Sequence, residues 1–230
     1  MKTPLLPAVS IEALAPLSEQ NFSDVLLLLN SNGTVCTFKQ RQPAAYASLD
    51  WVIPTGIVVF ITHSYFDGIF KEIGKEHYQR FKEAVSSLYK KALGDHPEIE
   101  FSIASAGKMK APSHFRGSLS FVYSSRRGYT VKLLFPLDIT TTDYAVSCEE
   151  FLKLITAHEA KHADDPLGME IELRAKERAA LSGNRFSAEH TLSTISLLVF
   201  WNRNDQCFHV ADAVASSRSK ALVSKRIGCE

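Results

Sequence analysis

Five consecutive residues carry the spacing of a metal-dependent hydrolytic site: His158-Glu159-Ala160-Lys161-His162, or HEAKH. Residues four apart lie on one face of a helix, so His158 and His162 can both reach one Zn²⁺. Glu159 projects beside them, where its carboxylate can take a proton from a zinc-bound water. Zinc lowers the pKa of that water towards neutrality, which makes it a nucleophile for a carbonyl carbon. The pattern therefore predicts zinc ligands at His158 and His162 and a general base at Glu159.

HEAKH resembles the HExxH motif of zincin metallopeptidases. In the gluzincin branch of that family the third zinc ligand is a Glu on a following helix, often within ExxA, and Glu172-Leu-Arg-Ala175 fits that pattern. The resemblance covers residues 158–175. It implies a peptidase-like zinc hydrolase with Glu172 as the third ligand, while Glu170 and Glu177 remain alternatives for that role.

A second interpretation gives HEAKH no chemistry. His158 and His162 continue the apolar stripe of Phe151 and Ile155 at steps of three and four residues. They would then form the polar end of an amphipathic helix whose tip meets solvent. The chain would be a non-catalytic interaction or regulatory protein in a multi-protein system, and the motif a coincidence of composition.

Three amphipathic helices are expected to position these residues. The second of them carries HEAKH and begins at either of two capping boxes, Thr140 with Asp143 or Ser147 with Glu150. The turn 164–168 would fold the second and third helices into an antiparallel hairpin. The expected ranges are Phe66–Leu93, about Thr141 or Ser147 to Ala163, and about Leu167–Leu181.

Apolar runs on either side of turn residues predict three β-hairpins. Because the strands come in adjacent pairs, we expect an α+β fold in which antiparallel hairpins pack against two or three amphipathic helices. Residues 1–230 are expected to form a single domain. The predicted strand pairs are Val25–Leu29 with Thr34–Phe38, Ser118–Tyr123 with Tyr129–Phe135, and Ile195–Trp201 with Cys207–Val210.

Composition narrows the class of protein. The chain has 230 residues, 45% of them hydrophobic, and a net charge of +1, which excludes a wholly disordered chain and disfavours a dedicated nucleic-acid binder. The four cysteines form no CxxC pair, and the start of the chain is a poor match to a signal peptide. We therefore expect a cytoplasmic protein with reduced thiols and leave a protein partner open.

One apolar run, Trp51–Ile61, is too short to cross a bilayer before His63 and Asp67 follow it. We expect a buried core element there, with membrane association through Trp51–Phe70 as the alternative. Residues 51–93 also resemble a segment of uncharacterised bacterial proteins, through the sequence YFDGIFKEIGKEHYQRF. That resemblance implies a bacterial source and no particular activity.

Overall fold

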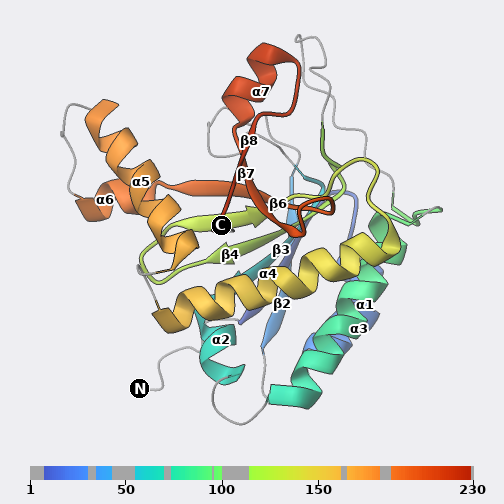
Figure 1. Cartoon of the computed structure of the whole chain (residues 1–230). Helices are drawn as coiled ribbons and strands as arrows, with labels where there is room; N and C mark the ends of the chain where they lie inside the picture. Colours follow the sequence, from blue (N-terminus) through green and yellow to red (C-terminus); the bar gives the residue numbers. More distant parts are fainter. Residues whose placement is uncertain are drawn as a thin grey trace.

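The computed structural model describes most of the chain. The described residues are 8–30, 35–42, 55–69, 74–94, 96–99, 114–161, 165–181 and 188–228. Within them the fold is a mixed α/β arrangement in which helices surround one sheet (Figure 1).

The sheet has eight strands in the order β2-β1-β3-β4-β5-β6-β7-β8. Its first strand in the chain therefore lies near one edge, and its last strand forms the other. The strands are β1 (Val9–Leu14), β2 (Cys36–Arg41), β3 (Ile57–Thr62), β4 (Leu119–Ser124), β5 (Thr130–Leu133), β6 (Ser196–Asn202), β7 (Cys207–Ala211) and β8 (Ser224–Arg226).

Helix α4 crosses one face of the sheet, and α1 and α3 lie side by side next to it (Figure 1). Helices α5 and α6 lie together at another side of the sheet, and α7 joins β7 to β8. The helices are α1 (Ser23–Leu29), α2 (His63–Ile69), α3 (Gly74–Ala92), α4 (Thr141–Lys161), α5 (Pro166–Leu181), α6 (Ala188–Ser193) and α7 (Ala213–Ser219), with a short 3₁₀ helix at Glu19–Phe22.

The sheet is mixed, which corrects the expectation of separate antiparallel hairpins. The pairs β1·β2, β3·β4 and β5·β6 are parallel, and the other four pairs are antiparallel. A parallel pair needs a long connection, and here each connection contains at least one helix. One continuous sheet thus takes strands from both halves of the chain.

The first predicted hairpin is wrong. Val25–Leu29 belongs to α1 rather than to a strand, and β2 pairs in parallel with β1 instead of folding back on it. The physical reason lies in the burial pattern: Val25, Leu26 and Leu29 are buried, while Leu27 is exposed. This spacing of one, three and four residues places the apolar side chains on one helical face.

The other two hairpins are confirmed. Strands β4 and β5 pair antiparallel around Gly128, whose φ of 90° lies in the left-handed region that glycine tolerates best. Strands β6 and β7 pair antiparallel around residues 203–206, where the Asn202 side chain accepts a hydrogen bond from the backbone N–H of Asn204 at 3.0 Å. In both cases the two strands predicted from the sequence pair with each other across a short turn.

The main core lies between the helices and one face of the sheet. In β3, Ile57, Val59 and Ile61 are at most 1% exposed and belong to this core. The apolar run at 51–61 is therefore a buried central strand over its described part, as expected, while residues 51–54 lie outside the described residues. A smaller apolar cluster, made of Phe115, Leu134, Leu198, Phe200 and Ala211, lies apart from the main core.

Two of the three predicted helices are confirmed and one is divided. Helix α4 begins at Thr141, because the Thr140 hydroxyl accepts the Asp143 backbone N–H at 3.1 Å and donates to its carboxylate at 2.8 Å. Helix α5 begins one residue before the predicted start. The helix expected at 66–93 is instead two helices, α2 and α3, which end and begin at residues 69 and 74.

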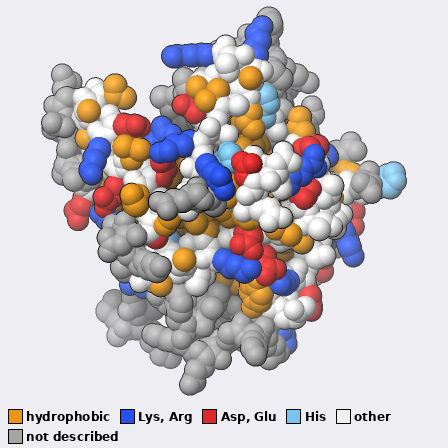
Figure 2. Space-filling view, in the orientation of Figure 1, with side chains coloured by type: hydrophobic (Ala, Val, Ile, Leu, Met, Phe, Trp, Pro, Cys, Tyr) orange, Lys and Arg blue, Asp and Glu red, His pale blue; other side chains and the backbone are white. Residues whose placement is uncertain are grey.

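None of the helices in the described ranges combines the length and apolar character that crossing a bilayer requires. On the face shown in Figure 2, Lys and Arg side chains are interspersed with Asp and Glu, and neither sign dominates. This mixture agrees with the net charge of +1.

Candidate functional site

His158 lies in the last turn of α4 and is only 4% exposed. Its Nδ1 contacts the Asp165 carboxylate at 2.6 Å, and its Nε2 contacts the Tyr129 hydroxyl. The imidazole thus joins three parts of the chain: α4, the residue before α5, and the residue before β5. The alternative in which this histidine meets solvent at a helix tip is wrong, because the stripe of Phe151 and Ile155 stays buried as far as His158.

Asp165 performs two tasks with its two oxygens. One oxygen contacts His158, and the other accepts the backbone N–H groups of Leu167 at 2.9 Å and Gly168 at 3.1 Å. The sequence explains this local structure, since Asp is a preferred N-cap and Pro166 is suited to the first helical position. The N-cap of α5 therefore also fixes the ring orientation of His158.

Glu159 turns its carboxylate towards a second tyrosine. The hydroxyl of Tyr123, a fully buried residue on β4, donates to Glu159 Oε1. Burial raises the pKa of the neighbouring Tyr129, and the negative charge of Asp165 adds to that rise. Tyr123 and Tyr129 thus place two hydroxyl groups beside the HEAKH residues, and Tyr129, His158 and Asp165 form a continuous chain of polar contacts.

Of the two remaining predicted ligands, His162 and Glu172, the structure describes only Glu172. His162 lies outside the described residues, so its position relative to His158 stays a prediction. Glu172, on α5, is half-buried and forms no hydrogen bond or ion pair within the described part of the chain. No contact among the described residues joins Glu172 to His158.

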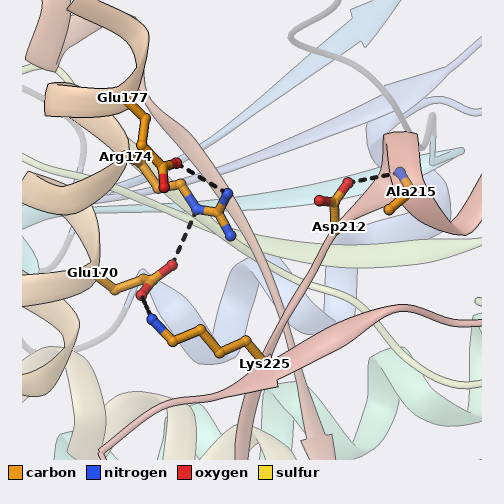
Figure 3. Close-up of polar contacts among 6 residues, drawn as sticks. All are labelled: Glu170, Arg174, Glu177, Asp212, Ala215 and Lys225. Atoms are coloured by element: carbon orange, nitrogen blue, oxygen red, sulfur yellow. Dashed lines mark hydrogen bonds and ion pairs between the residues drawn. The ribbon is translucent and has the colours of Figure 1, made fainter. Parts of the chain in front are cut away.

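The two alternatives to Glu172 as third ligand, Glu170 and Glu177, already form ion pairs. Glu170 is 7% exposed and lies between two cations, with Arg174 Nε at 3.0 Å and Lys225 Nζ at 2.8 Å (Figure 3). Glu177 contacts the same Arg174 at 3.4 Å. Of the three carboxylates considered on α5, Glu172 is the one whose oxygens have no competing partner among the described residues.

A second group of metal-ligating side chains lies on the β6–β7 hairpin. Asp205, Cys207 and His209 each offer one ligand atom, and these atoms all lie within 4.8 Å of one another. His209 contacts the Asp205 carboxylate through Nε2 at 2.8 Å and the Ser224 hydroxyl through Nδ1 at 3.1 Å. Arg226 Nε donates to Cys207 Sγ at 3.1 Å.

An apolar groove lies between α3 and α4. Its walls include Phe81, Val85, Tyr89, Tyr144 and Leu152, and a Lys82–Glu149 ion pair of 2.8 Å lies at its border. Burial raises the pKa of Tyr144 well above its usual range. The described groove therefore presents apolar and neutral surface rather than catalytic groups.

Sequence reasoning missed the partners of HEAKH and the whole of the second group. The β4–β5 hairpin was predicted, but no local pattern shows that it packs Tyr123 and Tyr129 against α4. Asp205, Cys207 and His209 did leave a usable pattern, because residues two apart on a strand share one face. The strand beginning at Cys207 was predicted, so Cys207 and His209 could have been paired.

Comparison with known proteins adds no assignment: no family model, no curated protein and no solved structure matches this chain. Its function must therefore be argued from the residues that the fold brings together.

Proposed function

We propose that the chain is a zinc-dependent hydrolase, peptidase-like, in which HEAKH supplies the site. The observation that carries the proposal is the Asp165 carboxylate 2.6 Å from His158 Nδ1. A zinc-binding histidine characteristically donates its second ring N–H to a carboxylate, which fixes the tautomer and leaves the other nitrogen for the metal. His158 has this support, and it is buried within the protein.

The residues have separate roles in this proposal. His158 Nε2 and His162 would ligate the metal, and Glu172 would be the third ligand, supported by its carboxylate's lack of a competing partner in the described ranges. When bound, zinc supplies a Lewis acid and a water of lowered pKa. Glu159 would accept that water's proton, and the Tyr129 hydroxyl, which occupies His158 Nε2 here, would move aside to become a hydrogen-bond donor.

The proposal treats residues 1–230 as one α+β domain. One sheet containing strands from residue 9 to residue 226 supports that treatment. A peptidase active site needs helices and sheet held in fixed relation. The contacts of His158, on α4, with the Asp165 cap of α5 and with Tyr129, just before β5, provide such a frame.

Metal content tests the ligand assignment. We expect about one zinc per chain at this site after dialysis, measured by elemental analysis, and loss of that zinc in His158→Ala because a ligand is gone. Glu172→Gln should weaken binding about tenfold or more, whereas Glu177→Gln, one turn further along α5, should leave it unchanged. Equal zinc in Glu172→Gln and Glu177→Gln would remove Glu172 from the site.

Hydrolysis tests the role of the base. Glu159→Gln should keep the zinc and lose hydrolysis of a quenched fluorescent peptide library by about 10²-fold or more, because the proton acceptor is removed and the ligands remain. Zinc loss in Glu159→Gln would instead show that this carboxylate is structural.

A second candidate function is a non-catalytic interaction or regulatory protein. The Tyr129 hydroxyl on His158 Nε2 favours it, since both ring nitrogens already have protein partners. In that case HEAKH binds no zinc, and Tyr129→Phe lowers stability by about 1–3 kcal/mol because it leaves a buried ring nitrogen without its partner. In the hydrolase, Tyr129→Phe should instead retain or strengthen zinc binding.

A further inference from the structure

The β6–β7 hairpin gathers three different ligand types in a short stretch of sequence. Asp205 lies in the turn, while Cys207 and His209 lie two residues apart on β7 and therefore share one face of the strand. Phe208, between them, packs in the main core against Phe151 of α4. The Cys207 and His209 side chains thus project to the sheet face opposite α4.

We propose that Asp205, Cys207 and His209 bind a divalent transition metal, Zn²⁺ in the first place, independently of HEAKH. Thiolate and imidazole ligands favour Zn²⁺ over Mg²⁺ or Ca²⁺, and one carboxylate completes a typical mixed donor set. The three ligand atoms lie within 4.8 Å of one another, whereas tetrahedral zinc holds its ligand atoms about 3.3–3.8 Å apart. Small side-chain rotations are enough to close that difference.

The imidazole already has the support that a ligand needs. Nε2 faces the Asp205 carboxylate at 2.8 Å, so a metal placed between them replaces one hydrogen bond with two coordinate bonds. Nδ1 faces the Ser224 hydroxyl at 3.1 Å. Because a hydroxyl can accept as well as donate, Ser224 can take the Nδ1–H that metal binding at Nε2 requires.

The thiol is also prepared for coordination. A metal binds the thiolate, and a neighbouring guanidinium favours that form. Arg226, opposite His209 on β8, donates from Nε to Cys207 Sγ at 3.1 Å. That hydrogen bond can persist when the sulfur is bound, and the two negative ligands then balance the charge of Zn²⁺.

The three proposed ligands differ in how far their side chains are exposed to solvent. Cys207 is 2% exposed and the His209 side chain 12%, whereas the Asp205 side chain is 40% exposed. Three protein ligands with solvent beside the carboxylate leave a fourth position for water. Such a three-ligand arrangement is typical of catalytic rather than structural zinc.

Cobalt spectroscopy distinguishes this site from HEAKH, because only the hairpin site contains sulfur. Titration of the metal-free protein with Co²⁺ alone should produce the near-ultraviolet thiolate-to-cobalt charge-transfer absorption. Cys207→Ser should abolish it, while His158→Ala and Cys36→Ala, which alters another buried cysteine at the far side of the sheet, should retain it.

Zinc affinity gives a second measurement that does not rely on replacing a buried residue. Asp205→Asn, in an exposed turn, should fold normally and bind Zn²⁺ about tenfold or more weakly by competition with a chromophoric chelator. An absent charge-transfer band, a band that survives in Cys207→Ser, or unchanged zinc affinity in Asp205→Asn would each overturn the proposal. A wild-type protein that shows the cobalt band but binds no zinc at HEAKH would overturn the hydrolase and leave this site intact.

Discussion

His158 occupies the position where the apolar stripe of α4 meets polar partners from two other elements. A buried imidazole with one unsatisfied nitrogen is costly, so Asp165 and Tyr129 contribute to stability whatever else they do. Asp165 matters most among these residues, because the same carboxylate also caps α5. The residue that would orient His158 for metal binding is thus also a structural residue.

A matched pair of caps separates these two roles. Asp165→Ala should lower the free energy of unfolding by about 2–4 kcal/mol, since it removes an N-cap and leaves His158 Nδ1 without a partner. Asp212→Ala removes only the N-cap of α7, where Asp212 accepts the Ala215 backbone N–H at 2.8 Å (Figure 3), and should cost about 1 kcal/mol. Urea unfolding measures both, and equal losses would show that the histidine contact adds nothing.

At the scale of elements, the β4–β5 hairpin positions both tyrosines of the candidate site. Its turn depends on Gly128, whose φ is 90° and whose missing Cβ would lie 2.8 Å from Ser193 Cβ. Any side chain there meets both backbone strain and a close neighbour. The turn therefore holds β5, and with it Tyr129, in register against α6.

Replacing this glycine should destabilise the fold. We expect Gly128→Ala to lower the free energy of unfolding by about 1–3 kcal/mol in urea denaturation. Gly94→Ala, at the end of α3, is the matched change: its Cβ would lie 3.4 Å or more from its neighbours, so it should shift stability by less than about 1 kcal/mol. A Gly128→Ala protein as stable as Gly94→Ala would contradict the argument.

The elements that sequence reasoning predicted correctly are those with local determinants. The two confirmed hairpins have turn residues between apolar runs, and α4 has both a cap and a stripe. The strand prediction for Val25–Leu29 was wrong because a short apolar stretch fits a strand and a helix equally well. Strand β1 and its parallel partner β2 were missed as a pair, since parallel pairing joins segments that no turn connects.

In the candidate site, too, the residues with local determinants were predictable and those brought together by the fold were not. HEAKH was visible because its spacing is helical and local, and His158 does lie on α4 beside Glu159. Its partners were not predictable, because Tyr123 and Tyr129 arrive from strands and Asp165 acts across a helix boundary. Conversely, Glu170 was a reasonable third-ligand candidate until its ion pairs with Arg174 and Lys225 were known.

At the scale of the whole molecule, the sheet buries a lysine within its middle. Lys132 on β5 is 4% exposed, and burial together with the charge of Arg41 lowers its pKa to about 7. The unfolded chain would keep this proton up to about pH 10.5. Between these two pH values unfolding takes up a proton, so the contribution of Lys132 to stability rises with pH and is lost as pH falls through about 7.

Removing the charge should flatten this dependence. In Lys132→Met, the rise in unfolding free energy between pH 7 and pH 9 should be smaller than in the wild type, by up to about 1.4 kcal/mol per pH unit. Lys90→Met, on the exposed side of α3, is the control and should keep the wild-type slope. Parallel pH profiles for wild type and Lys132→Met would mean that Lys132 ionises as freely as a solvent-exposed lysine.

The two outermost strands have a further consequence for self-association. An edge strand offers unpaired N–H and C=O groups, on which an identical chain can be added strand by strand into a fibre. Here β2 carries Lys39 and Arg41, and the three-residue β8 carries Lys225 and Arg226. Joining two such borders would bring these four cations together, and their ion pairs with the two carboxylates of Glu12 and Glu170 offset only part of the repulsion, so the charges at both edges disfavour strand-by-strand growth.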